Sequence, residues 1–523
     1  MERASKTRES RRASAGERGR PLKALLLAAV SGLLLFLSFP KFGQGALAWV
    51  CLVPLFASLR GRDIAGALML GLAGGLVFHV GLLYWVSGVV VRYGHLPFLL
   101  GVVVMLLLAL YMSLYVSLFA AGVTYFGRKQ VPLAVAAPVL WVLLEYGKAN
   151  LLTGFPWGAL AQSQYLNLPM IQIADLTGTY GISFLIVFVN AVLYDLVTRR
   201  ESRFFTIAEL ALGGLLVSAV YGYGVYRLAD TDAQVKNTPA KAASIVQGNI
   251  DQSVKWDPRF QEETIRRYVE YSGKAAARSP YLIVWPETAT PFFFQQTDDK
   301  QREVLSVAES TQAFLIFGSP SHRQVDGRLH YQNSAYLLSP GGEVLGRYDK
   351  VHLVPYGEYV PLRPFFPFIE KLAVGIGDFL PGENLEPLAL DGARAGILIC
   401  YEAIFPEISR TYRQKGASLL VNLTNDAWFG TSSAPYQHLA ITTFRAVENR
   451  LFVIRAANTG ISAFIAPTGE ILSQTGLFET TTLDGVFGVM DVRTFYSRFG
   501  DLFVYLCMAF FVMIGIMKRG RSA

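Results

Sequence analysis

The chain has 523 residues, with 47 Lys or Arg against 39 Asp or Glu and a formal net charge of +8. Hydrophobic residues make up 52% of the chain and charged residues 16%, whereas soluble domains carry about 25% charged residues. This composition excludes an ordinary soluble protein and favours a membrane protein. Basic residues gather before the first apolar stretch and after the last one, so the positive charge indicates membrane topology and not binding of nucleic acid.

Apolar stretches fill most of the first 225 residues and the last 25. A membrane-spanning helix needs about 20 mostly apolar residues. By this measure the predicted spans are 22–39, 44–59, 64–89, 96–125, 131–147, 181–197, 205–225 and 499–517. The first follows a basic stretch, as a signal peptide does. Because further spans come after it and no small-residue cleavage site is evident, we expect it to be retained.

The loops between the predicted spans alternate in charge. Those on the side of both basic termini carry Arg60, Arg62, Arg128, Lys129, Arg199 and Arg200. The opposite loops carry few basic residues, so the positive-inside rule places both termini in the cytoplasm. Seven spans before residue 226 then place the middle of the chain outside the cytoplasm, and a miscount of one span would reverse this placement.

These patterns divide the chain into four segments. We expect a basic cytoplasmic N-terminal segment at 1–21, a membrane domain of about seven spans at 22–225, an extracytoplasmic domain at 226–495, and a last span with a basic cytoplasmic tail at 496–523. Glu145 lies near the end of one span, before the aromatic turn segment 153–157. A carboxylate there is a functional candidate, although such residues are often paired structurally.

Short apolar runs alternate with amphipathic stretches in the extracytoplasmic segment. The predicted buried strands are 243–246, 281–285, 314–318, 395–400, 418–422 and 452–456. The predicted helices are 259–277, 302–311, 405–415 and 435–449. Such alternation predicts an α/β fold with helices covering sheets. The fold class is therefore a multi-span α-helical membrane domain plus an α/β domain.

Reactive side chains follow three of these strands, as Glu287, Cys400 and the pair Asn425-Asp426. A cysteine becomes a nucleophile when a base or a cation favours its thiolate. Glu287 can be that base if partial burial raises its pKa. Lys350 can supply positive charge for a tetrahedral oxyanion. The three residues together predict acyl chemistry with Cys400 as nucleophile.

Each residue also has a simpler interpretation. Taken alone, a cysteine at a strand end usually packs in a core, Glu287 can cap a turn, and Lys350 can be a solvated charge. His352 can be proposed as a cysteine partner or a metal ligand. The six histidines are scattered without paired spacing, so we expect no metal site and a structural His352.

The flanks of the three candidates carry a family resemblance. Glu287 in Trp-Pro-Glu, Lys350 in Tyr-Asp-Lys-Val-His-Leu and Cys400 in Cys-Tyr-Glu resemble the Glu-Lys-Cys triad of the nitrilase superfamily. With spans on both sides, the chain resembles the apolipoprotein N-acyltransferase family over nearly its whole length. The motifs are Gly154-Phe-Pro-Trp157, Gln247-Gly-Asn-Ile250, Pro355-Tyr-Gly-Glu358, Ile399-Cys-Tyr-Glu402, Asn425-Asp-Ala-Trp-Phe-Gly430 and Arg455-Ala-Ala-Asn-Thr-Gly460.

The resemblance implies a nitrilase-like α-β-β-α sandwich and a two-step reaction without a cofactor. Cys400 would take an acyl chain from a membrane phospholipid as a thioester, and the amine of a diacylglyceryl-modified apolipoprotein would accept it. The family pattern assigns supporting roles beside the triad. These fall on Glu358 and Glu402 next to the triad, Tyr401, Trp428 and Phe429 in the acyl pocket, and Trp256 on a mobile loop.

The setting implied is the inner membrane of a bacterium, with the catalytic domain on the periplasmic side. One alternative is a membrane-tethered amidase that uses the same triad to hydrolyse an amide. Another is a transporter or scaffold whose α/β domain has lost catalysis. The sequence leaves the oligomeric state open.

Overall fold

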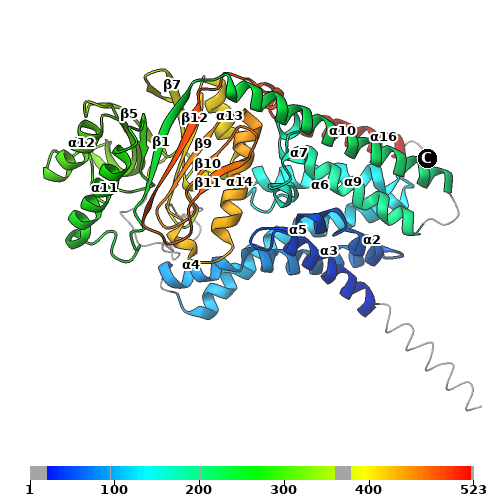
Figure 1. Ribbon diagram of the computed structural model, residues 1–523. Coiled ribbons are helices and arrows are strands. Elements are labelled where there is room, and N and C mark those ends of the chain that lie inside the picture. The colour runs from blue at the N-terminus through cyan, green and yellow to red at the C-terminus, as the bar shows by residue number, and fades with distance from the viewer. Residues whose placement is uncertain (1–20, 95, 199–202, 360–378, 520–523) are drawn as a thin grey trace, which may run out of the picture.

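The computed structural model describes residues 21–94, 96–198, 203–359 and 379–519. Its helical part and its α/β part lie side by side, and the long helix α10 (Arg203–Lys236) runs along the helical part and reaches the α/β part at one end (Figure 1). Several residues behind the topology prediction lie outside the described residues, namely the basic segment up to residue 20, Arg199, Arg200 and the tail from 520.

The helical part begins with the helix Pro21–Ser38. It continues with η1 (Gly45–Trp49), α2 (Val53–Leu59), α3 (Ile64–Leu83), α4 (Trp85–Gly94), α5 (Phe98–Arg128), α6 (Leu133–Asn150), η2 (Leu160–Gln164), α7 (Leu168–Ile171), α8 (Ala174–Thr177), α9 (Thr179–Thr198) and α10, and α16 (Leu502–Arg519) rejoins it after the α/β part.

Five helices of the described chain are long and apolar enough to cross a membrane. They are Pro21–Ser38, α3, α5, α9 and the segment Ile207–Lys236 of α10. Gly45–Leu59 and Leu502–Met517 are shorter apolar segments, and the first is broken between η1 and α2. Helix α10 also continues past residue 225, so the helical part ends at Lys236. The span count and the orientation remain predictions.

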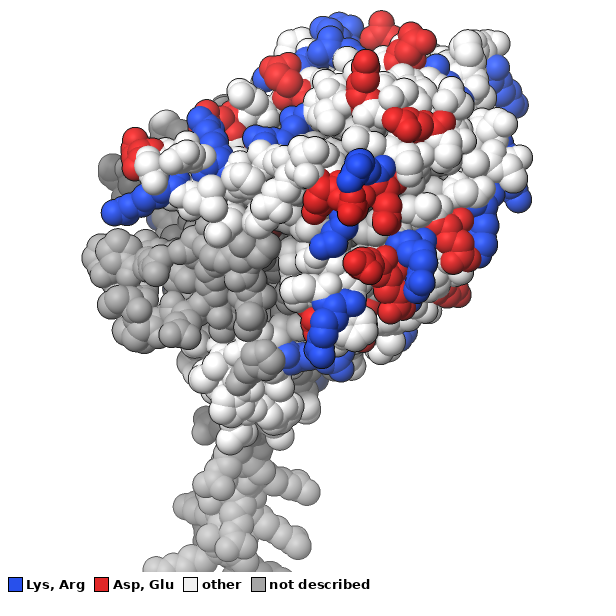
Figure 2. Space-filling view, turned by 90° about the vertical axis from the view of Figure 1, so that its left-hand side faces the viewer, with Lys and Arg blue, Asp and Glu red and all other residues white. Residues whose placement is uncertain are grey.

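The two parts expose different kinds of side chain on their surfaces. Helices α5, α10 and α16 expose large apolar side chains, such as Leu107 at 60%, Leu215 at 66% and Ile516 at 67%. Over the outer end of the α/β part, acidic and basic side chains are interspersed (Figure 2). Exposed apolar faces on helices are expected where lipid is the solvent, and mixed charges where water is.

The α/β part contains two six-stranded sheets, ordered β12-β1-β2-β3-β4-β5 and β11-β10-β9-β8-β7-β6. Their strands are β1 (Ala240–Gln247), β2 (Leu282–Val284), β3 (Phe314–Val325), β4 (Arg328–Leu338), β5 (Val344–Asp349), β6 (Leu388–Leu390), β7 (Ala393–Ile399), β8 (Leu419–Thr424), β9 (Val453–Ala457), β10 (Ala463–Ile465), β11 (Ile471–Gln474) and β12 (Thr481–Gly488). The helices and turns are η3 (Pro258–Phe260), α11 (Gln261–Ala276), α12 (Asp299–Thr311), η4 (Cys400–Ile404), α13 (Pro406–Gln414), η5 (Asp426–Phe429), α14 (Ala434–Asn449) and α15 (Phe495–Phe499).

Side chains that alternate between the two faces of each strand form the two cores of the sandwich. In β2, Leu282 and Val284 join the core between the sheets, whereas Ile283 joins a second core with Ile265 of α11 and Val304 of α12. Successive side chains of a strand point to opposite faces, so one short strand serves both cores. Helices α13 and α14 pack against the other sheet (Figure 1). The predicted α/β fold is confirmed, and all six predicted strands and four predicted helices are present.

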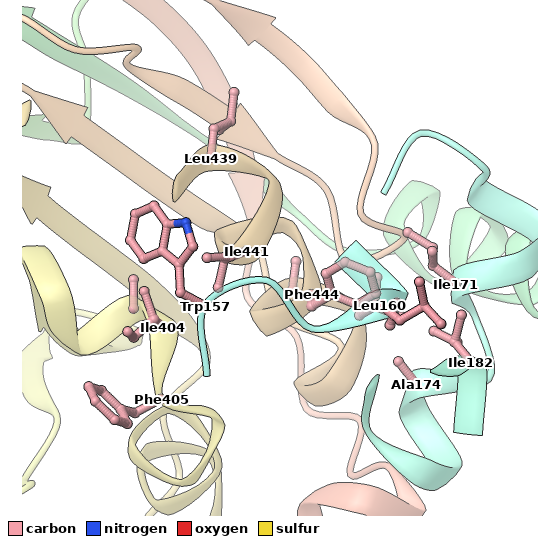
Figure 3. Close-up of a cluster of buried hydrophobic side chains, with 14 of the residues drawn as sticks. Trp157, Leu160, Ile171, Ala174, Ile182, Ile404, Phe405, Leu439, Ile441 and Phe444 are labelled. Atoms are coloured by element: carbon pink, nitrogen blue, oxygen red, sulfur yellow. The ribbon is translucent and has the colours of Figure 1, made fainter. Parts of the chain in front are cut away.

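An apolar cluster joins the helical part to the sandwich. Figure 3 shows Trp157 near Ile404 of η4, and Leu160 near Phe444 of α14, with Ile182 beyond it in the same cluster. The segment that follows α6 therefore packs against α14 and against η4, the turn that contains Cys400.

A buried ion pair reinforces this junction. Asp175 of α8 accepts from Arg450, which follows α14, at 2.7 Å between Oδ2 and Nη2. Both side chains are at most 2% exposed. Arg227 of α10 donates to the same oxygen at 2.9 Å, and the Tyr223 hydroxyl donates to Oδ1 at 2.8 Å.

We expect Asp175→Asn to destabilise the protein by roughly 3–5 kcal/mol, because it leaves the buried Arg450 charge uncompensated. Thermal unfolding of the detergent-solubilised protein measures this change. Asp230→Asn is the matched control, because it removes a more exposed partner of Arg227 and should cost at most about 1 kcal/mol. Equal losses for the two variants would contradict a junction held by Asp175.

Candidate active site

The three predicted triad residues all follow strands at one end of the sandwich. Glu287 comes after β2, Lys350 directly follows β5, and Cys400 directly follows β7 of the other sheet. Because the two sheets face each other, their strand ends bring these residues into one buried site, where Glu287 is 7% exposed, Lys350 1% and Cys400 8%. Residues far apart in the sequence therefore share one low-dielectric environment.

An asparagine connects the general-base candidate to the lysine. Asn333 of β4 donates through Nδ2 to Glu287 Oε1 at 2.8 Å and to Glu358 Oε1 at 2.9 Å. Lys350 Nζ lies 3.0 Å from Glu358 Oε1 and 2.9 Å from its Oε2. The Lys350 amide also donates to the Asn333 carbonyl at 2.8 Å. Glu358 thus fixes the ammonium, and Asn333 fixes both carboxylates.

The second oxygen of Glu287, Oε2, is buried and has no hydrogen-bond partner among the described residues. Burial raises the pKa of this carboxyl above its ordinary value, against the attraction of Lys350. A buried carboxylate with one free oxygen and a raised pKa is suited to accept a proton from a nearby acid.

The charges of the site set the resting state of Cys400. Burial would lower the pKa of the Lys350 ammonium, but the carboxylates of Glu358 and Glu287 outweigh it and raise that pKa. Burial also raises the pKa of the Cys400 thiol, the Glu287 carboxylate adds to the rise, and Lys350 opposes it. The resting site therefore holds a protonated thiol beside a fixed cation and a base. Proton removal has to accompany the attack of the sulfur.

Glu402 holds the backbone around the nucleophile. Its carboxylate is fully buried and accepts from four donors, the amides of Ile399, Val351 and His352 and the Tyr348 hydroxyl, at 2.7 to 3.1 Å. One side chain thus joins the turn before Cys400 to the loop after Lys350. Burial raises the pKa of Glu402 to about 7, and the Lys350 charge and the donors oppose the rise.

His438 of α14 holds the other side of that turn. Cys400 has a φ of +50°, a left-handed conformation that costs energy for a residue with a side chain. His438 Nε2 lies 3.2 Å from the Cys400 carbonyl oxygen, and Nδ1 lies 3.1 Å from Asp426 Oδ1 and 3.2 Å from Arg455 Nη2. Burial and the charge of Arg455 lower the pKa of His438, whereas Asp426 opposes the fall. Because the Cys400 carbonyl oxygen can only accept, Nε2 carries a proton and donates to it. Asp426 neutralises Arg455 at 2.7 Å.

The helical part supplies aromatic neighbours. The Tyr401 hydroxyl lies 3.4 Å from the Gly154 carbonyl oxygen, and its ring stacks on Phe155 at 6.4 Å. Trp428 packs edge-on against Tyr93 of α4 at 4.7 Å. These contacts join the segment after α6 to the turn that carries Cys400, and helix α4 to η5.

The other predicted pocket residues lie nearby with different surroundings. Phe429 packs against Trp85 at 4.9 Å between ring centroids. Trp256 lies in the turn that joins β1 to η3, directly after the buried Lys255. The ring of His352 stacks on Phe405 at 3.8 Å, the contact of a structural side chain.

Glu145 has a connecting position. Its Oε1 accepts from the Leu160 amide at 2.7 Å, which joins α6 to η2, and Lys148 donates to the carbonyls of Trp157 and Gly158 at 3.2 Å. In the described part of the chain, no contact joins Glu145 to the triad. This geometry favours a structural role that shapes the loop beside the site.

Sequence reasoning missed Asn333, Lys255 and His438. Asn333 stands in a strand that alternation did not reveal, and His438 stands in a predicted helix as one of six scattered histidines. Lys255 precedes Trp256, so its place in the same motif was the available signal. Within the described ranges, no group of three or more His, Cys, Asp or Glu side chains could hold a metal ion.

Comparisons with known proteins place the chain in a family. The family model of carbon-nitrogen hydrolases matches residues 242–489, and that of the apolipoprotein N-acyltransferase N-terminal domain matches residues 31–192. Among solved structures, an amidase from Nesterenkonia sp. is similar over 48% of this chain and 91% of its own, with 21% identity and a TM-score of 0.37.

Two relatives match along nearly their whole length. An apolipoprotein N-acyltransferase of Geobacter metallireducens is 45% identical over 507 residues, which cover 96% of both chains. One of Nitrosomonas europaea is 33% identical over 94% of this chain and 95% of its own. From these matches, which include the helical part as well as the sandwich, the chain belongs to the apolipoprotein N-acyltransferase family.

Proposed function

We propose that Cys400 takes an acyl chain from a membrane glycerophospholipid as a thioester and passes it to the N-terminal amine of the diacylglyceryl-cysteine of apolipoproteins. The observation that carries this proposal is the buried array in which Glu287 keeps one oxygen free while Glu358 and Asn333 fix its surroundings. Family membership favours acyl transfer over the amidase alternative.

The first half-reaction forms the thioester. The Cys400 sulfur attacks the ester carbonyl of the phospholipid as its proton passes to Glu287 Oε2. Lys350 stabilises the oxyanion of the tetrahedral intermediate, because its charge is already fixed there by Glu358. When the intermediate collapses, the carbon–oxygen bond breaks and Glu287 returns the proton to the departing lysophospholipid oxygen.

The second half-reaction uses the same groups in reverse order. The uncharged acceptor amine attacks the thioester carbonyl and loses a proton to Glu287. The carbon–sulfur bond then breaks, an amide is released, and Glu287 gives its proton back to the Cys400 sulfur. A thioester suits this exchange because it keeps the acyl group activated while one substrate leaves and the next arrives.

The surroundings of the site favour a lipid donor. Tyr401 and Trp428 contact Phe155 and Tyr93, which belong to the helical part. A site that acted only on a small soluble amide would not need walls from apolar helices. We further propose that the protein resides in the inner membrane of a bacterium with this site on the periplasmic side.

Removal of the nucleophile should abolish acyl transfer. We expect Cys400→Ala and Cys400→Ser to lose transfer from radiolabelled phospholipid to a diacylglyceryl peptide, with wild-type folding by thermal unfolding. Cys51→Ser is the matched control, because Cys51 is buried in the helical part, away from this chemistry. Transfer that persists in Cys400→Ala would contradict the proposal, and free fatty acid as the only wild-type product would favour the amidase.

Thioester formation should depend on pH through Glu287. The base acts when ionised, and burial raises its pKa above the ordinary value of about 4.3. We therefore expect the rate of single-turnover acylation to reach a plateau above the raised pKa and to be lost as the pH falls through it. Rapid-quench kinetics between pH 4 and 9 measures this limb. A wild-type limb centred at or below about pH 4.3 would be inconsistent with a buried Glu287 as base.

Orientation can be tested with one exposed cysteine. Ser306 lies on the exposed surface of α12, far from the apolar helices along the chain. We expect Ser306→Cys to react with a membrane-impermeant thiol reagent in intact spheroplasts, because the charge pattern places the sandwich outside the cytoplasm. The parent protein, whose three cysteines are buried, is the control. Reaction only after lysis would overturn the predicted orientation.

A further inference from the structure

A second buried lysine lies beside the triad. Lys255 belongs to the turn 252–256 after β1, and only 2% of its surface is exposed. Its Nζ donates to the backbone carbonyl oxygen of Glu287 at 3.1 Å. The side chain therefore reaches from one turn to the backbone of the general base.

The turn that carries Lys255 is held firmly in place. The Lys255 amide donates to the Asp251 carbonyl at 3.1 Å, and Gln252 accepts from Asn425 Nδ2 at 2.7 Å. Asn458 bonds both backbone groups of Ile250, at 2.9 and 2.8 Å. These bonds tie the turn to the ends of β8 and β9 in the second sheet, so the position of Lys255 is built into the fold.

The charge of Lys255 lacks the compensation that a structural lysine needs. In the ranges that the structure describes, no carboxylate lies within ion-pair distance of its Nζ, whereas Lys350 is bound by both oxygens of Glu358. An isolated buried ammonium costs several kcal/mol. The ionisable groups that act on its charge are Glu287 and Cys400. A charge retained at such a cost, with the base and the nucleophile as its neighbours, points to a role in the reaction.

We infer that Lys255 is a positioning residue for acyl transfer, which fixes the backbone of Glu287 and supplies a second positive charge that favours the ionised base. This inference rests on the proposed roles of Glu287 and Cys400. Lys350 is paired with Glu358, whereas Lys255 has no paired carboxylate among the described residues, so its charge can respond when negative charge moves between Glu287 and the sulfur.

The charge of Lys255 should make the acylation rate depend on pH. Burial lowers the pKa of the Lys255 ammonium to about 8, although Glu287 and Cys400 oppose the fall. Of the neighbouring charges, Lys350 and Glu358 act on Glu287 as well. As the pH rises through about 8, Lys255 loses its proton, and the positive charge that stabilises negative charge developing on the Cys400 sulfur is lost. Acylation should therefore decline on this basic side.

The test compares Lys255→Met and Lys255→Arg with wild type and with Lys274→Met, an exposed lysine of α11. Single-turnover acylation by phospholipid in nanodiscs is followed by intact-protein mass spectrometry across pH 6 to 10, with thermal unfolding of each variant. We expect Lys255→Met to acylate roughly 10- to 100-fold more slowly, with KM within about 3-fold of wild type. Its unfolding temperature should stay equal or rise, because an apolar side chain replaces an uncompensated charge.

Lys255→Arg keeps a charge that does not titrate, so its basic limb should move to higher pH and its rate should exceed that of Lys255→Met. A Lys255→Met protein with wild-type acylation overturns the inference. A Lys255→Met protein that is less stable but acylates normally per folded molecule also overturns the inference, because this result identifies a purely structural lysine. An arginine variant that fails to fold leaves the decision to the methionine variant. Failure of the proposed function is separate, because it requires acyl transfer by Cys400→Ala.

Discussion

The buried ammonium of Lys350 is the constraint on which the site depends. A cation that is 1% exposed needs nearby negative charge, and Glu358 provides it through both carboxylate oxygens. With that pair satisfied, Asn333 can hold Glu287 by one oxygen and leave the other free. The raised pKa of Glu287, the protonated thiol of Cys400 and the fixed oxyanion cation all follow from burying these groups together.

Hydrogen bonds to the backbone hold the buried site together and connect it to the helical part. Glu402 and His438 hold opposite sides of the Cys400 turn. Gln437, next to His438 on α14, accepts from Trp157 Nε1 at 2.8 Å and donates to the carbonyls of Pro40 and Leu82 at 3.1 and 3.3 Å. Adjacent residues of one helix thus bind the helical part and the nucleophile. The same site can therefore be walled by residues that lie beside lipid-facing helices.

The sequence predicted the parts of the fold whose pattern is local. Buried parallel strands such as β2 and β7 are short apolar runs, and each ends near a reactive residue, so Glu287 and Cys400 could be found. Strands β4, β5, β6, β10, β11 and β12, which the sequence did not reveal, form antiparallel pairs. Asn333 was not found because β4 was not predicted. The roles of Lys255 and His438 depend on contacts with residues that are distant in the sequence. The observed helix boundaries differ from the predicted ones where polar residues continue a helix, as in α10 beyond residue 225.

The most direct test of this account is a pulse-chase experiment on a single preparation of the enzyme. Purified enzyme is loaded from phospholipid with an isotopically labelled acyl chain, freed of donor, and mixed with a diacylglyceryl peptide. Peptide mapping by mass spectrometry then follows the label with time. The account predicts an acyl adduct on Cys400 that disappears with the same rate constant with which N-acylated peptide appears. An adduct on another residue, or N-acylated peptide formed without loss of a Cys400 adduct, would contradict it.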